Sequence, residues 1–257
     1  MGLHYRGKRY YRVINYRRIV IIIMVLSLIV AGSILALTLI NHNRSRGVLN
    51  ITGTQFFVVK AGNYNTLQEA NSSANAIRSA GGAGFIINND NGFNVSIAVY
   101  SRLSDATAIA SRLNTQQDFN ATVATIEIAP MIISASNSEC ASDFSQFLTQ
   151  PIEVFNSLMR HNQDLEEGNI TDHHAITILT QMRNVLNQQL AALNNFNTEF
   201  VNYVSQLIEF YRDFSRLVSD TIALRLGATL AGNIRHLTIA TIYNFHNLAN
   251  DFSQHNA

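Results

Sequence analysis

Three histidines and two glutamates lie close together in the second half of the chain. His161, His173 and His174 flank Glu166 and Glu167, and these residue types bind zinc and related metals. The chain has no H-E-x-x-H sequence, and adjacent residues such as His173 and His174 point to different sides of a helix. We therefore predict that these are surface histidines of a helix and that they form no metal site.

Other residues with catalytic potential lack the sequence context that catalysis needs. Cys140 is the single cysteine, so it excludes an intrachain disulfide, and nothing around it resembles a papain-type nucleophile. Gly81-Gly82-Ala83-Gly84 is not followed by the Lys-Ser/Thr of a phosphate loop. We predict no catalytic residue and no cofactor. A hydrolase in residues 131–257 without a recognisable motif is the weaker alternative.

A long apolar run follows the N-terminus. Residues 19–40 (Ile19 to Ile40) carry no charge, and 22 residues at 1.5 Å each cross roughly 30 Å of hydrocarbon. A cleaved signal peptide would have an apolar core of about 7–15 residues and an A-x-A-like site, which this segment lacks. Six Lys/Arg residues precede the run, whereas only Arg44 and Arg46 follow it closely.

The positive-inside rule then sets the orientation of the chain. We predict a cytoplasmic tail over residues 1–18 and an uncleaved transmembrane helix over 19–40 of the cell membrane. A linker over 41–53 and all later residues are predicted to be extracytoplasmic. After Arg46, 10 Lys/Arg face all 17 Asp/Glu, a balance of −7. This balance argues against nucleic-acid binding, which rests on phosphate neutralisation.

Strand and helix patterns alternate from residue 54 to residue 129. The predicted strands, rich in β-branched and aromatic residues, are 55–60, 85–88, 93–97 and 122–128. The predicted helices, with apolar residues at helical spacing, are 66–80 and 105–113. Thr66 and Glu69 form a capping-box pattern, Asp105 is the predicted cap of the second helix, and Asn91-Gly92 predicts a hairpin.

The two halves of this segment repeat at an offset of 36 residues. The matched pairs are Phe57 and Phe93, Val59 and Val95, Tyr64 and Tyr100, Leu67 and Leu103, Ala70 and Ala106, Ala74 and Ala110, and Ile77 and Leu113. Such self-similarity indicates a duplicated βαβ unit, as in split ferredoxin-like folds. We predict a four-stranded sheet with two helices on one face and an open second face.

The pattern resembles the SPOR domain, the sporulation-related repeat of bacterial envelope proteins, over residues 54–129. The marks of the resemblance are Val59–Tyr64, Gly81-Gly82 and Val95–Tyr100, in this order behind a single predicted span. The resemblance implies binding of septal peptidoglycan, as denuded glycan strands stripped of stem peptides, through the open face of the sheet. It implies glycan contacts at Lys60, Asn63 and Asn94, although the family often has Gln at the position of Lys60 and Gly at that of Ala98.

Strand alternation places these positions on one face of the sheet. The residues predicted to face the helices are Phe57, Val59, Phe93, Val95 and Ile97. Val58, Lys60, Asn94 and Ser96 then line the opposite face, with Phe56 nearby. The predicted glycan site therefore comprises Lys60, Asn63, Asn94, Ser96 and Phe56. A solvated sheet face without a ligand is the alternative.

Residues 130–257 lack the strand pattern and are predicted to be helical. Pro151 interrupts a helical stripe from Asp143 to Leu165 and should kink that helix or start a new segment. An apolar series with a period of seven residues predicts one helix over 172–225, or two that bend at Asn194-Asn195. Its members are Leu179, Leu186, Leu193, Phe200, Leu207 and Phe214.

The positions beside this series are also apolar, which favours a helical bundle over a two-stranded coiled coil. Binding of protein partners or self-association through residues 172–225 is then a secondary prediction. Arg183 and Asn197 on the seam fit a register device and a partly hydrated seam equally well.

The sequence thus predicts an α+β protein with one transmembrane helix, a β-α-β-β-α-β domain and an all-α C-terminal bundle. The predicted function is that of a non-catalytic, membrane-anchored envelope protein that binds peptidoglycan in cell division or sporulation. The alternative is a membrane-anchored scaffold that acts through its C-terminal helices with little or no glycan binding.

Overall fold

The structure is a computed structural model of the chain. It describes residues 47–89, 92–116, 120–135, 138–196, 200–225 and 229–254. All of these belong to one compact unit, Ser45–Ala257. The predicted cytoplasmic tail and the predicted transmembrane helix, residues 1–40, lie outside the described residues. Among the helices that the structure does describe, none has both the length and the apolar character needed to cross a membrane.

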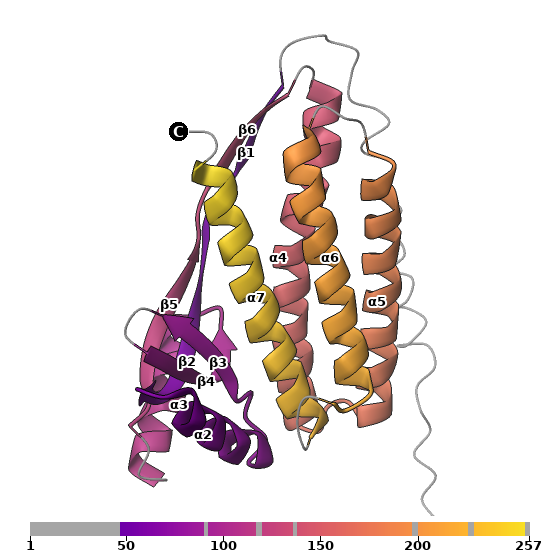
Figure 1. The fold of residues 1–257 in the computed structure, drawn as a ribbon. Coiled ribbons are helices and arrows are strands. Elements are labelled where there is room, and N and C mark those ends of the chain that lie inside the picture. Colours follow the sequence, from indigo (N-terminus) through magenta and orange to yellow (C-terminus); the bar gives the residue numbers. More distant parts are fainter. Residues whose placement is uncertain are drawn as a thin grey trace, which may run out of the picture. The chain divides into compact units, whose positions relative to one another are not determined.

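A four-stranded antiparallel sheet forms the β part of the fold (Figure 1). Its strands lie in the order β3-β4-β2-β5. Their bounds are β2 Thr54–Tyr64, β3 Phe85–Asn89, β4 Gly92–Tyr100 and β5 Thr122–Ile128. Helices α2 (Leu67–Ser79) and α3 (Leu103–Gln116) follow β2 and β4 along the chain. The predicted β-α-β-β-α-β order is confirmed, and the strand order is that of a split βαβ fold.

The local signals at the first helix act as the sequence predicted. The Thr66 side chain accepts a hydrogen bond from the Glu69 backbone N–H, and the Glu69 carboxylate accepts one from the Thr66 N–H. Gly84 has a φ of +52°, a left-handed conformation that favours glycine, as the chain turns into β3. The predicted cap of α3 is wrong, because α3 begins at Leu103 and Asp105 lies inside its first turn.

The repeat of 36 residues places equivalent side chains at equivalent points of the fold. Ala70 and Ala74 of α2, like Ala106 and Ala110 of α3, are buried against the sheet. Small residues at these points let each helix approach the strands closely. The residues predicted to face these helices do so, and they are Phe57, Val59, Phe93, Val95 and Ile97.

A second, two-stranded ribbon lies outside this sheet. β1 (Gly47–Ile51) pairs antiparallel with β6 (Met131–Ala135), from Gly47 opposite Ala135 to Ile51 opposite Met131. The prediction that residues 41–53 are only a linker and that β structure ends at Pro130 was therefore wrong. Alternation explains the ribbon, because Leu49, Ile51, Met131 and Ile133 are buried while Val48 and Ile132 are exposed.

Four helices complete the fold (Figure 1). They are α4 Ser138–Glu166, α5 Asp172–Asn194, α6 Val201–Ile222 and α7 Leu230–Gln254. α4 continues through Pro151, which lies inside it, so no new segment starts there. Thr171 caps α5, since its side chain accepts a hydrogen bond from the His174 N–H.

The apolar series with a period of seven is split between two helices that pack on each other. α5 ends at Asn194 and α6 begins at Val201, so the single long helix is wrong and the break at Asn194-Asn195 is confirmed. All six members of the series are buried. They stabilise contacts within the chain, as a bundle requires. Asn197 lies outside the described residues.

Candidate functional site

The predicted glycan-binding residues lie on one face of the sheet, but that face is not open. Lys60 is half-buried and Asn63 is exposed. Asn94, Ser96 and Phe56 are buried, with exposed fractions of 6%, 0% and 1%. The prediction of an open second face is therefore wrong, and only Lys60 and Asn63 of the predicted site remain in contact with solvent.

Helix α7 crosses one end of this face. Near its start, His236 Nδ1 lies 3.0 Å from the carbonyl oxygen of Ala83, just before β3. Farther along, His246 Nδ1 lies 2.6 Å from the carbonyl oxygen of Glu127 on β5. His236 and Tyr243 both place their rings edge-on to Phe85 of β3, with centroids 5.2 and 6.3 Å away. One stripe of α7 thus crosses the sheet from β3 to β5.

Apolar side chains of the strands pack on this face against the helices. The residues of this face that join the main hydrophobic core are Phe56, Val58, Phe85, Val99 and Ile126. The same core contains Phe155 of α4 and Phe245 of α7. Two β-bulges, at Val59/Lys60 and Lys60/Gly62, shift the register of β2 against β4 beside Lys60. The face is therefore structural core around Phe56, Val58 and Val99 and becomes polar towards Lys60 and Asn63.

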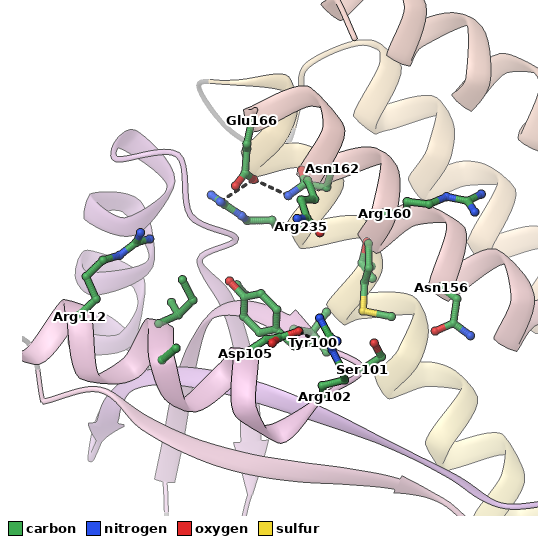
Figure 2. A pocket seen from close by; sticks show the side chains of 17 residues that line it. Tyr100, Ser101, Arg102, Asp105, Arg112, Asn156, Arg160, Asn162, Glu166 and Arg235 are labelled. Atoms are coloured by element: carbon green, nitrogen blue, oxygen red, sulfur yellow. Dashed lines mark hydrogen bonds and ion pairs between the residues drawn. The ribbon is translucent and has the colours of Figure 1, made fainter. Parts of the chain in front are cut away.

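A polar pocket of about 610 Å³ lies beside this interface (Figure 2). It opens between the end of β4, α3, α4 and α7. We call it the Tyr100 pocket and define it by Tyr100, Asp105, Arg112, Asn162, Glu166 and Arg235. This volume falls within the range of about 300–1,000 Å³ that is usual for small-ligand sites.

Arg235 of α7 ties three elements together at one wall of the Tyr100 pocket. Its Nη1 donates to the carbonyl oxygen of Gly81, which follows α2, at 2.5 Å. Its Nη2 pairs with Glu166 Oε1 of α4, also at 2.5 Å. Asn162 donates to the same carboxylate oxygen from one turn earlier on α4 (Figure 2). This network fixes α7 against the β-sheet domain and holds one wall of the pocket rigid.

Two polar groups of the Tyr100 pocket have unused hydrogen-bonding capacity. Asn162 is 8% exposed, and its Oδ1 is buried with no partner among the described residues. Burial raises the pKa of Tyr100, while Arg235 opposes that rise. The phenol therefore stays protonated at neutral pH, and no hydrogen bond from it to the described residues is recorded. A ligand hydroxyl could donate to Asn162 Oδ1, and a hydroxyl or carboxylate oxygen of the ligand could accept from the Tyr100 phenol.

The histidines weighed for a metal site lie on the helices around the turn between α4 and α5. His173 and His174 are exposed on α5, and His161 is half-buried on α4. Burial lowers the pKa of His161, and Arg160 adds to that effect. In the described ranges, no three His, Cys, Asp or Glu side chains gather as metal ligands would.

The comparison with protein families covers the β-sheet domain. Residues 53–125 match the SPOR domain. The predicted resemblance, given for residues 54–129, is confirmed over residues 54–125. No curated protein and no solved structure matches the chain. The match covers β2 to β5 and ends within β5, so α4 to α7 lie beyond it.

The helices beyond the SPOR domain supply the features that sequence reasoning missed. The cover comes from α7, whose sheet-facing residues recur at helical spacing as His236, Tyr243 and His246. Their mixed polarity hides them from a search for apolar periodicity. The Tyr100 pocket joins residues up to 135 positions apart, Tyr100 and Arg235, so no local spacing could reveal it.

Proposed function

We propose that this protein is a non-catalytic envelope protein that binds denuded septal peptidoglycan in cell division or sporulation. The observation that carries the proposal is the SPOR match over residues 53–125. SPOR domains form a family of binding domains, not of enzymes, and generally bind peptidoglycan in division. The β-α-β-β-α-β order and the antiparallel sheet support the same assignment.

The proposal includes a membrane anchor at residues 19–40. The uncharged run Ile19 to Ile40 and the six basic residues before it support an N-terminus in the cytoplasm. The SPOR domain and the helices would then lie outside the cell membrane, where peptidoglycan is found. The anchor would confine the search for glycan to the membrane plane.

A second candidate function is favoured by the cover over the SPOR sheet. Helix α7 and the shared hydrophobic core occupy the face that the family resemblance assigns to glycan. A membrane-anchored scaffold, acting through its helices with little or no glycan binding, would tolerate this cover. The broad helical surface of α5, with exposed polar residues, would then contact the partner.

Retention of the full-length chain on isolated cell walls tests the first function. The purified chain, in detergent, is mixed with amidase-treated sacculi and with untreated sacculi from the same preparation. We expect clear retention on the amidase-treated walls and several-fold less on the untreated ones. If the chain is retained on neither wall sample, the peptidoglycan-binding proposal is overturned.

Localisation in cells separates the two functions. A full-length fluorescent fusion should gather at septa in wild-type cells and lose that position in cells without amidases, which lack denuded glycan. Septal localisation that persists without amidases supports the scaffold. Point variants suit this experiment better than a deletion of residues 54–129, because the deletion would uncover the apolar surface formed by Phe155 and Phe245.

A further inference from the structure

We propose that the Tyr100 pocket is the glycan-binding site of this protein and that it takes a sugar bearing a carboxylate group. This inference rests on the proposed function, since it names where and how the glycan binds. It replaces the covered sheet face with a hollow that reaches solvent at the edge of the SPOR domain.

The charges of the pocket favour an anion. Arg102, Arg112, Arg160 and Arg235 line it together with two carboxylates, Asp105 and Glu166. Both carboxylates are already paired, Asp105 with Arg102 at 2.8 Å and Glu166 with Arg235 at 2.5 Å. The structure records no ion pair for Arg112 or Arg160 with any residue that it describes. An arginine without a partner matches a carboxylate, which its guanidinium can bind through two parallel hydrogen bonds.

The uncharged groups of the pocket favour a sugar over a simple ion. Tyr100 presents an aromatic ring edge and a hydroxyl, and such amphipathic side chains suit ligands with one apolar and one polar side. Asn156, Asn162 and Gln163 add side-chain amides from α4. Amides both donate and accept hydrogen bonds, as sugar hydroxyls do, and Asn162 Oδ1 is buried and without a described partner.

The chemistry of denuded glycan supplies the required anion. When an amidase removes a stem peptide from the glycan strand, the amide bond is hydrolysed and a free carboxylate remains on that sugar. Each stripped sugar therefore carries one negative charge next to its ring, whereas a sugar that retains its peptide does not. A pocket of about 610 Å³ is large enough to take one such sugar unit of a strand.

Binding of denuded glycan strands by point variants of the full-length chain tests the proposal. The key variant is Arg112→Gln on α3, because the side chain is exposed and no structural bond is recorded for it. The matched control is Arg212→Gln on α6, an exposed arginine outside the pocket that changes the net charge equally. Lys60→Ala tests the solvent-exposed rim of the SPOR sheet. The ligands are denuded strands and the same strands after methyl esterification of their carboxylates.

We expect Arg112→Gln to weaken binding of denuded strands by about tenfold or more, as loss of a charge-assisted hydrogen bond predicts. Esterified strands should bind wild type about as weakly as denuded strands bind Arg112→Gln, while Arg212→Gln retains full affinity. Binding that survives Arg112→Gln but falls in Lys60→Ala would overturn the pocket and keep the function. Binding of denuded strands by all three variants with the wild-type affinity would also overturn the assignment of the site to the pocket, but not the proposed function. A wild-type chain that binds no strand would overturn both proposals.

Discussion

Phe56 of the SPOR sheet and Phe155 of helix α4 meet edge to face, with ring centroids 6.1 Å apart and ring planes at 77°. Both side chains are buried, with exposed fractions of 1% and 0%. Phe155 also contacts Phe214 of α6 and Phe245 of α7. The sheet face and the helical bundle therefore share one apolar core, and the two parts should unfold together.

Phe56→Ala tests this shared core. We expect a loss of about 3–5 kcal/mol in the free energy of unfolding, because truncation of a buried phenylalanine leaves a cavity. Chemical denaturation would measure the loss in free energy. Hydrogen exchange, in a separate experiment, would measure protection at β4 and at α6. Protection should fall at both elements, since Val99 of β4 and Phe214 of α6 belong to the same hydrophobic core as Phe56.

The control for Phe56→Ala is Leu67→Ala at the start of α2. Leu67 is 51% exposed, so its truncation should change stability by no more than about 0.5 kcal/mol. Loss of protection at β4 alone in Phe56→Ala, with α6 unchanged, would contradict a common core. The sheet and the bundle would then be separately stable bodies.

The contact between α7 and the sheet should weaken in acid. Burial lowers the pKa of His236, and Arg78 adds to this, while the bond with the Ala83 carbonyl opposes it. The unfolded chain, with a histidine pKa of about 6.5, then binds more protons than the folded chain below that pH. The stability from neutral His236 is present above pH 6.5 and is lost as the pH falls through and below it.

Urea denaturation between pH 8 and pH 5 measures this dependence. We expect the unfolding free energy to fall with pH more steeply in wild type than in His236→Phe, which has no ring proton to gain. The pKa of His161 is also lowered by burial, so His161 should account for part of the pH dependence that remains in His236→Phe. His173→Gln, on the exposed start of α5, is the control. Identical slopes for wild type and His236→Phe would exclude His236 as a source.

Local signals predicted several parts of the fold correctly because they act over a few residues. The capping box at Thr66, the alternation of Phe57 and Val59 and the break at Asn194-Asn195 depend on neighbours in the chain. Each of these appears in the structure. Alternation also assigned Asn94 and Ser96 to the correct face of the sheet.

Alternation could not reveal what lies on that face. Asn94 and Ser96 are polar, and polarity predicts exposure, yet both are buried. Phe56 and Val58 indicated burial instead, because two apolar residues on a face predicted to be open need another element to cover them. Long-range contacts such as Arg235 with Gly81 have no signature in spacing, so the sequence could not predict the Tyr100 pocket.

Tyr211 offers a test of the bundle core at high pH. Its hydroxyl donates to the Phe147 carbonyl oxygen at 3.0 Å, and the side chain is 0% exposed. Burial raises the pKa of Tyr211 far above its ordinary value. Above about pH 10 the unfolded chain loses this proton while the folded chain keeps it, so stability should fall as the pH rises.

Tyr211→Phe should therefore lose stability at neutral pH and gain relative stability in alkali. At pH 7 we expect a loss of about 0.5–1.5 kcal/mol from the missing hydrogen bond. Between pH 10 and pH 11 the difference from wild type should shrink, because the variant has no phenol at this position to ionise. Guanidinium denaturation at both pH values measures it. A constant difference across this range would contradict a buried, protonated Tyr211.

A matched pair of glycines separates backbone strain from steric clash. Gly84 and Gly168 both have positive φ, +52° and +72°, which costs an L-residue about 1–2 kcal/mol. A Cβ at Gly84 would lie 2.3 Å from the Ala74 carbonyl oxygen, whereas a Cβ at Gly168 would meet nothing within 4 Å. Gly168→Ala should therefore lower the free energy of unfolding only by the cost of the left-handed backbone, about 1–2 kcal/mol. Gly84→Ala should cost about 2–5 kcal/mol, because overpacking adds about 1–3 kcal/mol to the strain.

Thermal and urea unfolding of the two alanine variants would measure this difference. Gly84 joins α2 to β3 beside the Gly81 carbonyl that Arg235 holds, so its variant should also loosen the edge of the Tyr100 pocket. Hydrogen exchange at Ala83 should then rise in Gly84→Ala and stay unchanged in Gly168→Ala, because a Cβ at Gly168 meets nothing within 4 Å and leaves the nearby Glu166–Arg235 pair in place. Equal losses in the two variants would show that the packing of α2 against β3 relaxes around the added methyl group.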